Sequence, residues 1–289
     1  MTAAGSAVAR FTPRDRRALF LMSLVGIVVG YGAAMISSTI PFVRPALDVS
    51  EGGMFGILAV TRAISLLGIV FAFAADREGR REPFLAAFAL IPVGNLLTGL
   101  FPHTIVFGLS QSITRIGVVA VAALSIVYLA EELSPGRRAF GIGVYGISGA
   151  MGGGLALIIL PFADTGTDRW RLLFGFTAVG LLVLPMLNRF LVESRAFVRT
   201  TSRVGYQALM SSESAGYFWV LAAAAFLIAA FSGPAFDFVL ERLITGLDWE
   251  TRDAALLLIV FSGLGTVGLL IGGRVADVVG RRIIMAAPG

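Results

Sequence analysis

The sequence contains no cysteine, no lysine and a single histidine, His103. The absence of cysteine excludes disulfide bonds, zinc–thiolate sites and thiol catalysis. Charged residues make up only 14% of the chain, whereas a soluble domain of this length usually carries about a quarter. The chain therefore lacks the charge to cover a surface that faces water, and most of its outer surface must face lipid.

Long apolar stretches take the place of the missing charge. Hydrophobic residues make up 57% of the chain, and the mean hydropathy is +0.87. A helix needs about 20 apolar residues to cross the bilayer core, and none of the stretches shows the alternation that is typical of a membrane barrel. We predict an all-α, polytopic membrane protein with about eight transmembrane helices, at 18–40, 54–75, 84–101, 104–129, 139–160, 172–191, 217–238 and 254–273.

The arginines indicate how these helices are oriented, because cytosolic connections collect positive charge. With a cytosolic N-terminus, most arginines fall on the inside, in groups such as Arg14, Arg16 and Arg17. Only Arg44, Arg169, Arg171, Arg242 and Arg252 fall outside. Both termini are therefore predicted to be cytosolic, and the protein itself is predicted to lie in the cell membrane. No basic stripe with interleaved aromatic residues is present, so nucleic acid is not predicted as a partner.

One charged motif occurs twice, as ADREGRR at residues 75–81 and as ADVVGRR at residues 276–282. Both copies follow an even-numbered predicted helix on the cytosolic side. Gly79 and Gly280 can adopt the left-handed conformation of a tight turn, and Asp76 and Asp277 can face a helix N-terminus. Two copies at equivalent places indicate a duplicated six-helix bundle, which is the architecture of major facilitator transporters.

Here the sequence resembles a known family. The two motifs are similar to the signature loop of the major facilitator superfamily, between helices 2 and 3, and to its echo after helix 8. Glu131 and Arg138 in EELSPGRR resemble the E-x6-R element of the sugar-porter branch, VESR at 192–195 resembles its PESPR element, and DRWRLLF at 168–174 resembles the opening of helix 6. The resemblance implies transport of a small solute by alternating access.

The resemblance also implies twelve helices, whereas this chain stops at RRIIMAAPG, where the ninth would begin. We therefore expect a six-helix bundle at 1–191, a cytosolic linker at 192–216 and the first two helices of an incomplete second bundle at 217–289. Two functions stay open: secondary active or facilitative transport of a sugar, an organic acid or a similar metabolite, and a truncated, non-transporting scaffold that needs a partner for the missing helices. The oligomeric state is not indicated.

A cytosolic latch is predicted from the loop charges and turn glycines. The resemblance implies that such loops close the inner gate, and by pseudosymmetry Asp277 should face the start of the fifth helix near Arg137 and Arg138. The predicted latch comprises Asp76, Arg77, Gly79, Arg80, Arg81, Glu131, Arg138, Glu193, Asp277, Gly280, Arg281 and Arg282.

A substrate path is predicted from polar residues within the apolar stretches. Arg115 lies about 16 Å and Arg62 about 12 Å into their helices. Buried arginines are costly and usually face a cavity or a partner, although Arg62 could also extend outward to the membrane surface. The path candidates are Arg115, Arg62, Gln111, Thr114, Ser110, Asn95 and Tyr31, with hydrogen bonding between helices as the alternative for each uncharged one.

No carboxylate is predicted to lie deep in the membrane; the nearest, Asp237, falls near the outer end of the seventh helix. Proton symport therefore lacks an evident titratable group, although a coupling proton stays open. Two buried cations without an acid also leave an anionic substrate open. GIGVYG at 141–146, together with Gly149 and Gly152–Gly154, indicates close helix packing rather than a nucleotide site, since no strand precedes it. Ser148 has no base nearby for catalysis. We predict no enzyme, cofactor or metal site.

Overall fold

The computed structural model describes residues 11–134, 137–194 and 215–279, and from residue 267 chiefly the backbone. Every regular element in these ranges is helical. The helices are α1 (Pro13–Ser38), α2 (Ile40–Ala46), α3 (Glu51–Ser65), α4 (Ile69–Glu78), α5 (Arg81–Leu100), α6 (Thr104–Glu132), α7 (Arg138–Ile159), α8 (Arg169–Gly175), α9 (Val179–Phe190), α11 (Ala215–Glu241) and α12 (Thr251–Val279). Short 3-10 or π-helical segments extend them at Leu66–Gly68, Leu160–Thr165, Phe176–Ala178 and Arg242–Gly246.

The predicted fold class is confirmed. Seven helical segments of the described residues are long and apolar enough to cross a membrane, and α12 covers the eighth predicted stretch. Two of the segments are continuous through a 3-10 turn: α3 with α4, and α8 with α9. The predicted linker at 192–216 lies largely outside the described residues, so the division into bundles stays a prediction.

The helices extend beyond the apolar stretches because their caps lie in the polar connections. The first helix begins at Pro13 rather than Ala18. Thr12 accepts from the backbone N–H of Asp15, and the Asp15 carboxylate accepts from the backbone N–H of Thr12. This capping box, with proline in the first turn, starts the helix before the membrane span.

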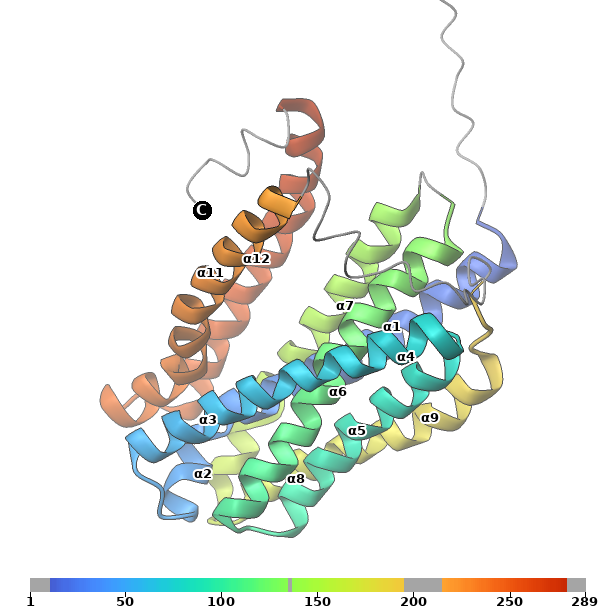
Figure 1. The fold of residues 1–289 in the computed structure, drawn as a ribbon. Coiled ribbons are helices and arrows are strands. Elements are labelled where there is room, and N and C mark those ends of the chain that lie inside the picture. The colour runs from blue at the N-terminus through green and yellow to red at the C-terminus, as the bar shows by residue number, and fades with distance from the viewer. Residues whose placement is uncertain (1–10, 135–136, 195–214, 280–289) are drawn as a thin grey trace, which may run out of the picture.

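The ends of the helices gather at two opposite ends of the molecule (Figure 1). The beginnings of α1, α5, α7 and α11 and the ends of α6, α9 and α12 lie at one end, which the arginine pattern predicts to be cytosolic. Helices α11 and α12 run in opposite directions, joined at the outer end (Figure 1). This pair meets the other helices near the outer end and diverges from α7 towards the cytosolic end.

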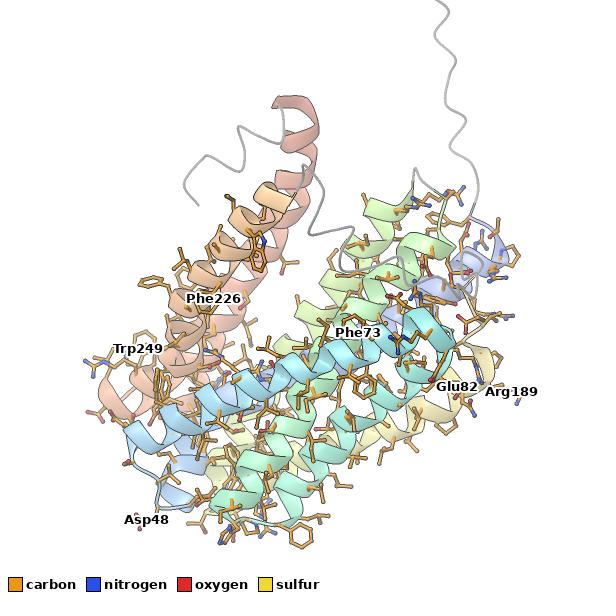
Figure 2. The ribbon with its side chains drawn as sticks, viewed as in Figure 1. Asp48, Phe73, Glu82, Arg189, Phe226 and Trp249 are labelled. Carbon is orange, nitrogen blue, oxygen red and sulfur yellow. The ribbon has the colours of Figure 1, made fainter. Side chains whose placement is uncertain are left out.

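The surface along the middle of the molecule is apolar, as a lipid-facing surface requires. Phe73 is 50% exposed and Phe226 71% exposed, and both project outward from the helices in Figure 2. The labelled polar residues Glu82 and Arg189 lie at the cytosolic end, and Asp48 lies at the outer end. This distribution fits a chain whose middle is in hydrocarbon and whose ends are in water.

Glycines allow the closest helix contact, between α1 and α7. A Cβ at Gly30 would lie 1.9 Å from the carbonyl oxygen of Gly149, and one at Gly152 would lie 2.1 Å from that of Ile27. The backbones approach this closely only without side chains. Close packing is therefore confirmed for Gly149 and Gly152, whereas Gly146 has nothing within 4 Å and does not contribute.

The seventh predicted helix is longer at its outer end than the sequence indicated. It continues through Glu241 and then as a π-helical segment to Gly246. The predicted stretch ends at Phe238, with Asp237 near its outer end and Glu241 in the connection that follows. Both are buried instead, each 5% exposed. Asp237 lies four residues before the end of α11, near the outer end as predicted, but it is buried inside the protein, which the sequence did not indicate.

Candidate functional site

The first copy of the repeated motif forms a tight turn between α4 and α5. Gly79 has φ +114°, which side chains rarely adopt. The carboxylate of Glu193 accepts hydrogen bonds from the backbone N–H of Arg80 at 2.7 Å and of Arg81 at 3.3 Å. A carboxylate at this place satisfies N–H groups that begin α5 and interacts favourably with the helix dipole. Glu193 therefore caps the helix that the turn begins.

Arg80 connects three helices. Its guanidinium forms an ion pair with Asp76 on α4 and donates to both oxygens of Glu131 on α6, at 2.9 and 3.3 Å. Burial lowers the pKa of Arg80, but the hydrogen bonds to Glu131 and Asp76 outweigh it, so the pKa is raised overall. Arg80 therefore stays charged and holds α4, α5 and α6 together.

Arg81 connects the start of α5 to the end of α9. It donates to the carbonyl oxygens of Leu191, at 3.1 Å, and Asn188, at 2.5 Å, and to the Asn188 side chain at 2.6 Å. These last carbonyls of a helix have no partner within the helix, so Arg81 caps the C-terminus of α9. We call Asp76, Arg80, Arg81, Glu131 and Glu193 the cytosolic network.

Two further ion pairs at the cytosolic end were missed from the sequence. Arg14 donates to both oxygens of Glu132, at 2.6 and 2.8 Å, and Arg137 donates to Asp15 at 2.8 Å. Arg14 also reaches the carbonyl oxygen of Glu193, at 3.2 Å. These residues lie in connections or in the terminal turns of helices, and each bonds to a partner more than 100 residues away in the sequence. No local motif marks them.

The other predicted latch residues are placed differently. Arg77 is exposed on the last turn of α4. Arg138 is exposed and donates to the carbonyl oxygen of Leu133, so Glu131 pairs with Arg80 and not with Arg138. Asp277 is described by its backbone alone, and in Figure 1 the end of α12 lies away from the start of α7. Gly280, Arg281 and Arg282 lie outside the described residues.

Most of the predicted path residues form one hydrogen-bonded group between α5 and α6. Gln111 donates to Asn95 at 3.0 Å and to Thr98 at 2.8 Å, Ser110 and Thr98 are 2.6 Å apart, and Thr114 donates to the carbonyl oxygen of Ser110 at 3.1 Å. All five are at most 1% exposed. This arrangement matches the alternative to a substrate path, in which these side chains form hydrogen bonds between helices. Their place on a substrate path stays a prediction.

Tyr31 also bonds within the bundle: its hydroxyl donates to the carbonyl oxygen of Leu173 at 2.7 Å and joins α1 to α8. Thr98 was not predicted from the sequence, where a lone threonine near a helix end carries no signal. Gln111 Oε1 is buried and has no partner among the described residues.

Arg62 and Asp237 form an ion pair between α3 and α11. Asp237 also accepts a hydrogen bond from the Ser37 hydroxyl on α1, at 2.5 Å. The Arg62 side chain is 35% exposed and that of Asp237 7%. The prediction that no acid lies among the buried cations is therefore wrong, and so is the outward extension of Arg62, because α11 supplies the carboxylate that neutralises it.

Arg115 lies in the middle of α6 and is largely enclosed. No hydrogen bond or ion pair joins it to another residue in the part of the chain that the structure describes. It lies close enough to Asp237 and Arg62 to interact electrostatically with both. These three residues carry one net positive charge, and Arg115 is the one of the three without an ion-pair partner among the described residues.

Two more contacts join α11 and α12 to the other helices at the outer end. Arg44 on α2 forms an ion pair with the buried Glu241 on α11, and Thr251 at the start of α12 donates to Asp164 at 2.9 Å. We call Arg44–Glu241 and Arg62–Asp237 the outer ion pairs. Neither was predicted, since each joins residues more than 170 positions apart.

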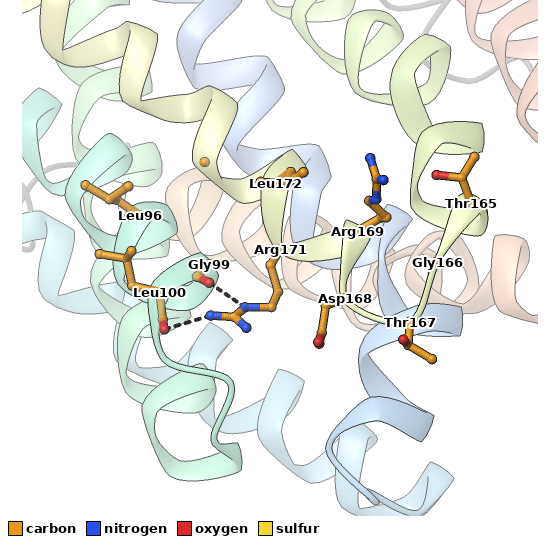
Figure 3. Close-up of a pocket in the computed structure, with 11 residues that line it drawn as sticks. Leu96, Gly99, Leu100, Thr165, Gly166, Thr167, Asp168, Arg169, Arg171 and Leu172 are labelled. Carbon is orange, nitrogen blue, oxygen red and sulfur yellow. Dashed lines mark hydrogen bonds between the residues drawn. The ribbon is translucent and has the colours of Figure 1, made fainter.

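A cleft of about 640 Å³ opens at the outer end, between the end of α5 and the loop before α8 (Figure 3). Arg171 points across it and donates to the carbonyl oxygens of Gly99, at 2.8 Å, and Leu100, at 3.0 Å. None of the predicted path residues lines this cleft. It is therefore distinct from the midplane site that the sequence predicts.

Comparisons with known proteins agree with this architecture. The chain is 24% identical over 200 residues to the inner membrane transport protein YnfM of Escherichia coli, covering 68% of this chain and 47% of YnfM. It is 29% identical over 189 residues to polyol transporter 5 of Arabidopsis thaliana, covering 60% and 34%. The chain therefore spans about half, or less, of the length of these curated relatives.

Solved structures share the fold. A bacterial homologue of the human lysosomal transporter Spinster, inward-facing and unoccupied, matches with a TM-score of 0.73 at 19% identity, covering 94% of this chain and 64% of that one. A D-xylose–proton symporter matches with a TM-score of 0.68 at 20% identity, covering 91% and 69%.

The family profile described as Major Facilitator Superfamily matches residues 22–289. With its apolar helices, this makes the chain a multi-pass protein of the cell membrane. The chain belongs to the major facilitator superfamily.

Proposed function

We propose that this chain transports a small solute across the membrane by alternating access, and that the structure corresponds to the inward-open state. The observation that supports this most is an asymmetry between the two ends. At the outer end, the outer ion pairs and the Thr251–Asp164 hydrogen bond join α11 and α12 to the remaining helices. At the cytosolic end, the same two helices diverge from α7 (Figure 1).

The cytosolic network then holds together the cytosolic ends of the helices in the first bundle. Its bonds join α4, α5, α6 and α9 to one another, so these helices move as one body. A latch between the bundles would need Asp277, Arg281 and Arg282 to approach this network, which we propose happens when the cytosolic end closes. Rigid bundles that rock about a midplane site are the general mechanism of such carriers.

Arg115 is proposed as the group that binds the substrate at this site. It is the uncompensated cation near the junction of α3, α6 and α11, so an oxygen-rich solute such as a sugar, a polyol or an organic acid fits best. The names of the relatives, a polyol transporter and a D-xylose–proton symporter, support the same range. With Asp237 present, the preference for an anion is weaker than the sequence suggested.

The mechanism is tested by two spin-labelled double-cysteine variants, since the chain has no cysteine of its own. Gly52→Cys with Leu247→Cys measures the outer separation, and Gly143→Cys with Gly216→Cys measures the cytosolic one; all four positions are exposed. Alternating access predicts two populations in which one separation lengthens as the other shortens. A single fixed separation at both ends would instead support the scaffold function.

Uptake into proteoliposomes tests the substrate class. A panel of a pentose, a polyol and a dicarboxylic acid should give saturable uptake of at least one, reduced in Arg115→Gln. Protein-free liposomes and the Gly154→Ala variant, whose added methyl would meet nothing within 4 Å, serve as controls. Uptake that no member of the panel saturates would contradict this range of substrates.

A further inference from the structure

Asp237 occupies the junction between the two parts of the molecule. It is carried by α11, its carboxylate contacts Ser37 on α1 and Arg62 on α3, and its side chain is 7% exposed. It lies 9 residues before Gly246, about 13 Å along the helix axis at 1.5 Å per residue. A carboxylate at this depth is costly unless it is paired or neutralised.

The surroundings make the charge of Asp237 depend on Arg62. A cavity of about 30 Å³ adjoins the pair, and apart from Arg62 and Asp237 it is lined by apolar residues, Phe55, Leu58, Ala59, Pro234 and Phe238. A space of this size can hold one water molecule, which gives a proton a place to enter. If α3 and α11 separate, the ionised carboxylate is left in an apolar site without its partner, and proton binding removes that cost.

The charged groups around Asp237 come from three helices of the first bundle and from its own helix. Arg62 is its ion-pair partner on α3, and Arg115 on α6 interacts with it electrostatically. Arg44 on α2 and Glu241, one turn further along α11, pair with each other. Arg62 is therefore the one cation bonded to Asp237 within the described residues, and it is also the more exposed partner, so it can reach water when the pair breaks.

We propose that Asp237 is the proton-binding group of this carrier and that proton binding opens the outer face. The step is a simple transfer: a hydronium ion in the cavity beside the pair gives a proton to a carboxylate oxygen of Asp237 and becomes water, the ion pair with Arg62 is lost, and the Arg62 guanidinium becomes hydrated. The inference rests on the proposed alternating access and adds the coupling ion to it.

Linkage fixes the direction of the effect. The closed outer end holds Asp237 ionised against Arg62, so the inward-open state has the lower affinity for the proton. The outward-open state separates the pair and binds the proton more tightly. Because coupling is reciprocal, acidification must increase the outward-open population. One linked proton changes the population ratio by at most about tenfold per pH unit.

The experiment measures the outer separation in the spin-labelled Gly52→Cys, Leu247→Cys variant from pH 5 to pH 9, without substrate. With no other substitution, the ratio of long to short distances should fall about tenfold per pH unit over part of this range. Asp237→Asn mimics the protonated acid, so it should give mostly long distances at every pH. Arg62→Gln removes the pairing that distinguishes the two states, so it should flatten the dependence of the distance ratio on pH.

The matched control is Glu241→Gln, which removes the other outer ion pair. It should shift the ratio but keep its slope with pH. If Glu241→Gln abolishes the slope and Asp237→Asn keeps it, the proton binds elsewhere and the proposal is overturned, while alternating access stands. If both populations are present and neither depends on pH, proton coupling is likewise overturned. If the outer distance never changes under any condition, the proposed function fails as well.

Discussion

The carboxylate of Glu193 lies directly against Gly79: a Cβ at position 79 would be 2.6 Å from Oε2 of Glu193. The same carboxylate accepts the backbone N–H groups of Arg80 and Arg81. Glycine is therefore required at position 79 for two reasons: its φ is positive, and the capping carboxylate occupies the space where a Cβ would lie. The motif after the second predicted helix and Glu193, which follows the sixth, therefore form one structural unit.

Replacing Gly79 with alanine should destabilise the protein. The new Cβ is strained at φ +114° and displaces the Glu193 carboxylate, so we expect a loss of about 1–3 kcal/mol. Thermal unfolding followed by tryptophan fluorescence in detergent measures this as a lower midpoint. Gly56→Ala is the control, since its Cβ meets nothing within 4 Å in α3 and should raise the midpoint slightly. Equal midpoints for the two variants would contradict the cap.

Arg80 and Glu131 should be energetically coupled. Arg80→Gln and Glu131→Gln each leave a charged partner unpaired, whereas the double variant removes both charges, so its cost should be smaller than the sum by about 0.5–3 kcal/mol. The measurement is a double-mutant cycle of unfolding midpoints. Additive costs would mean that the pair does not stabilise the fold.

The contribution of the Arg80 charge should not change with pH in the working range. The hydrogen bonds to Glu131 and Asp76 raise the pKa of Arg80 in the folded protein above its ordinary value. A raised pKa means that the stabilisation is complete below the ordinary value and is lost only as the pH rises through the folded value. The cost of Arg80→Gln should therefore be the same at pH 6 and pH 9. A cost that declines between these values would show that another group controls the network.

The turn at Gly79 could be predicted because its determinants are local. Glycine, the paired arginines and the preceding aspartate stand within six residues, and the copy at 276–282 marks them as a motif. Which carboxylates those arginines would meet depends on contacts across the bundle. Glu131 and Glu193 were named as latch residues, yet their roles as the Arg80 partner and the α5 cap follow only from the packing of α6 and α9.

Asp237 shows why the buried charges could not be predicted. The apolar stretch around it ends at Phe238, and a carboxylate at such a boundary normally marks the water interface. The helix continues because Arg62, 175 residues earlier in the chain, supplies the neutralising charge. Hydropathy averages over neighbours in sequence, so it cannot register a partner at that distance. The Arg44–Glu241 ion pair could not be predicted for the same reason, since its partners are 197 residues apart in the sequence.

Replacing Gln111 with leucine should distinguish packing from substrate binding. Gln111 donates to Asn95 and Thr98 between α5 and α6, so leucine leaves two buried acceptors with fewer donors, at a cost of about 1–3 kcal/mol. If the network is structural, the unfolding midpoint falls and the KM for solute uptake is unchanged. A raised KM at an unchanged midpoint would instead place Gln111 on the substrate path. Ser112→Ala, which removes only a bond to its own helix at Gly108, is the control.

Replacing Arg115 with glutamine should reduce transport without reducing stability. The guanidinium of Arg115 has no hydrogen-bonded partner among the described residues, and a charge at this depth costs roughly 2.5–3.5 kcal/mol on insertion scales. Removing it should therefore leave the unfolding midpoint unchanged or higher, while solute uptake falls because the binding cation is gone. The paired Arg62 provides the comparison: Arg62→Gln leaves Asp237 buried without its ion-pair partner and should lower the midpoint. If Arg115→Gln lowers the midpoint as much as Arg62→Gln does, Arg115 is part of the ion-pair structure and does not bind the solute.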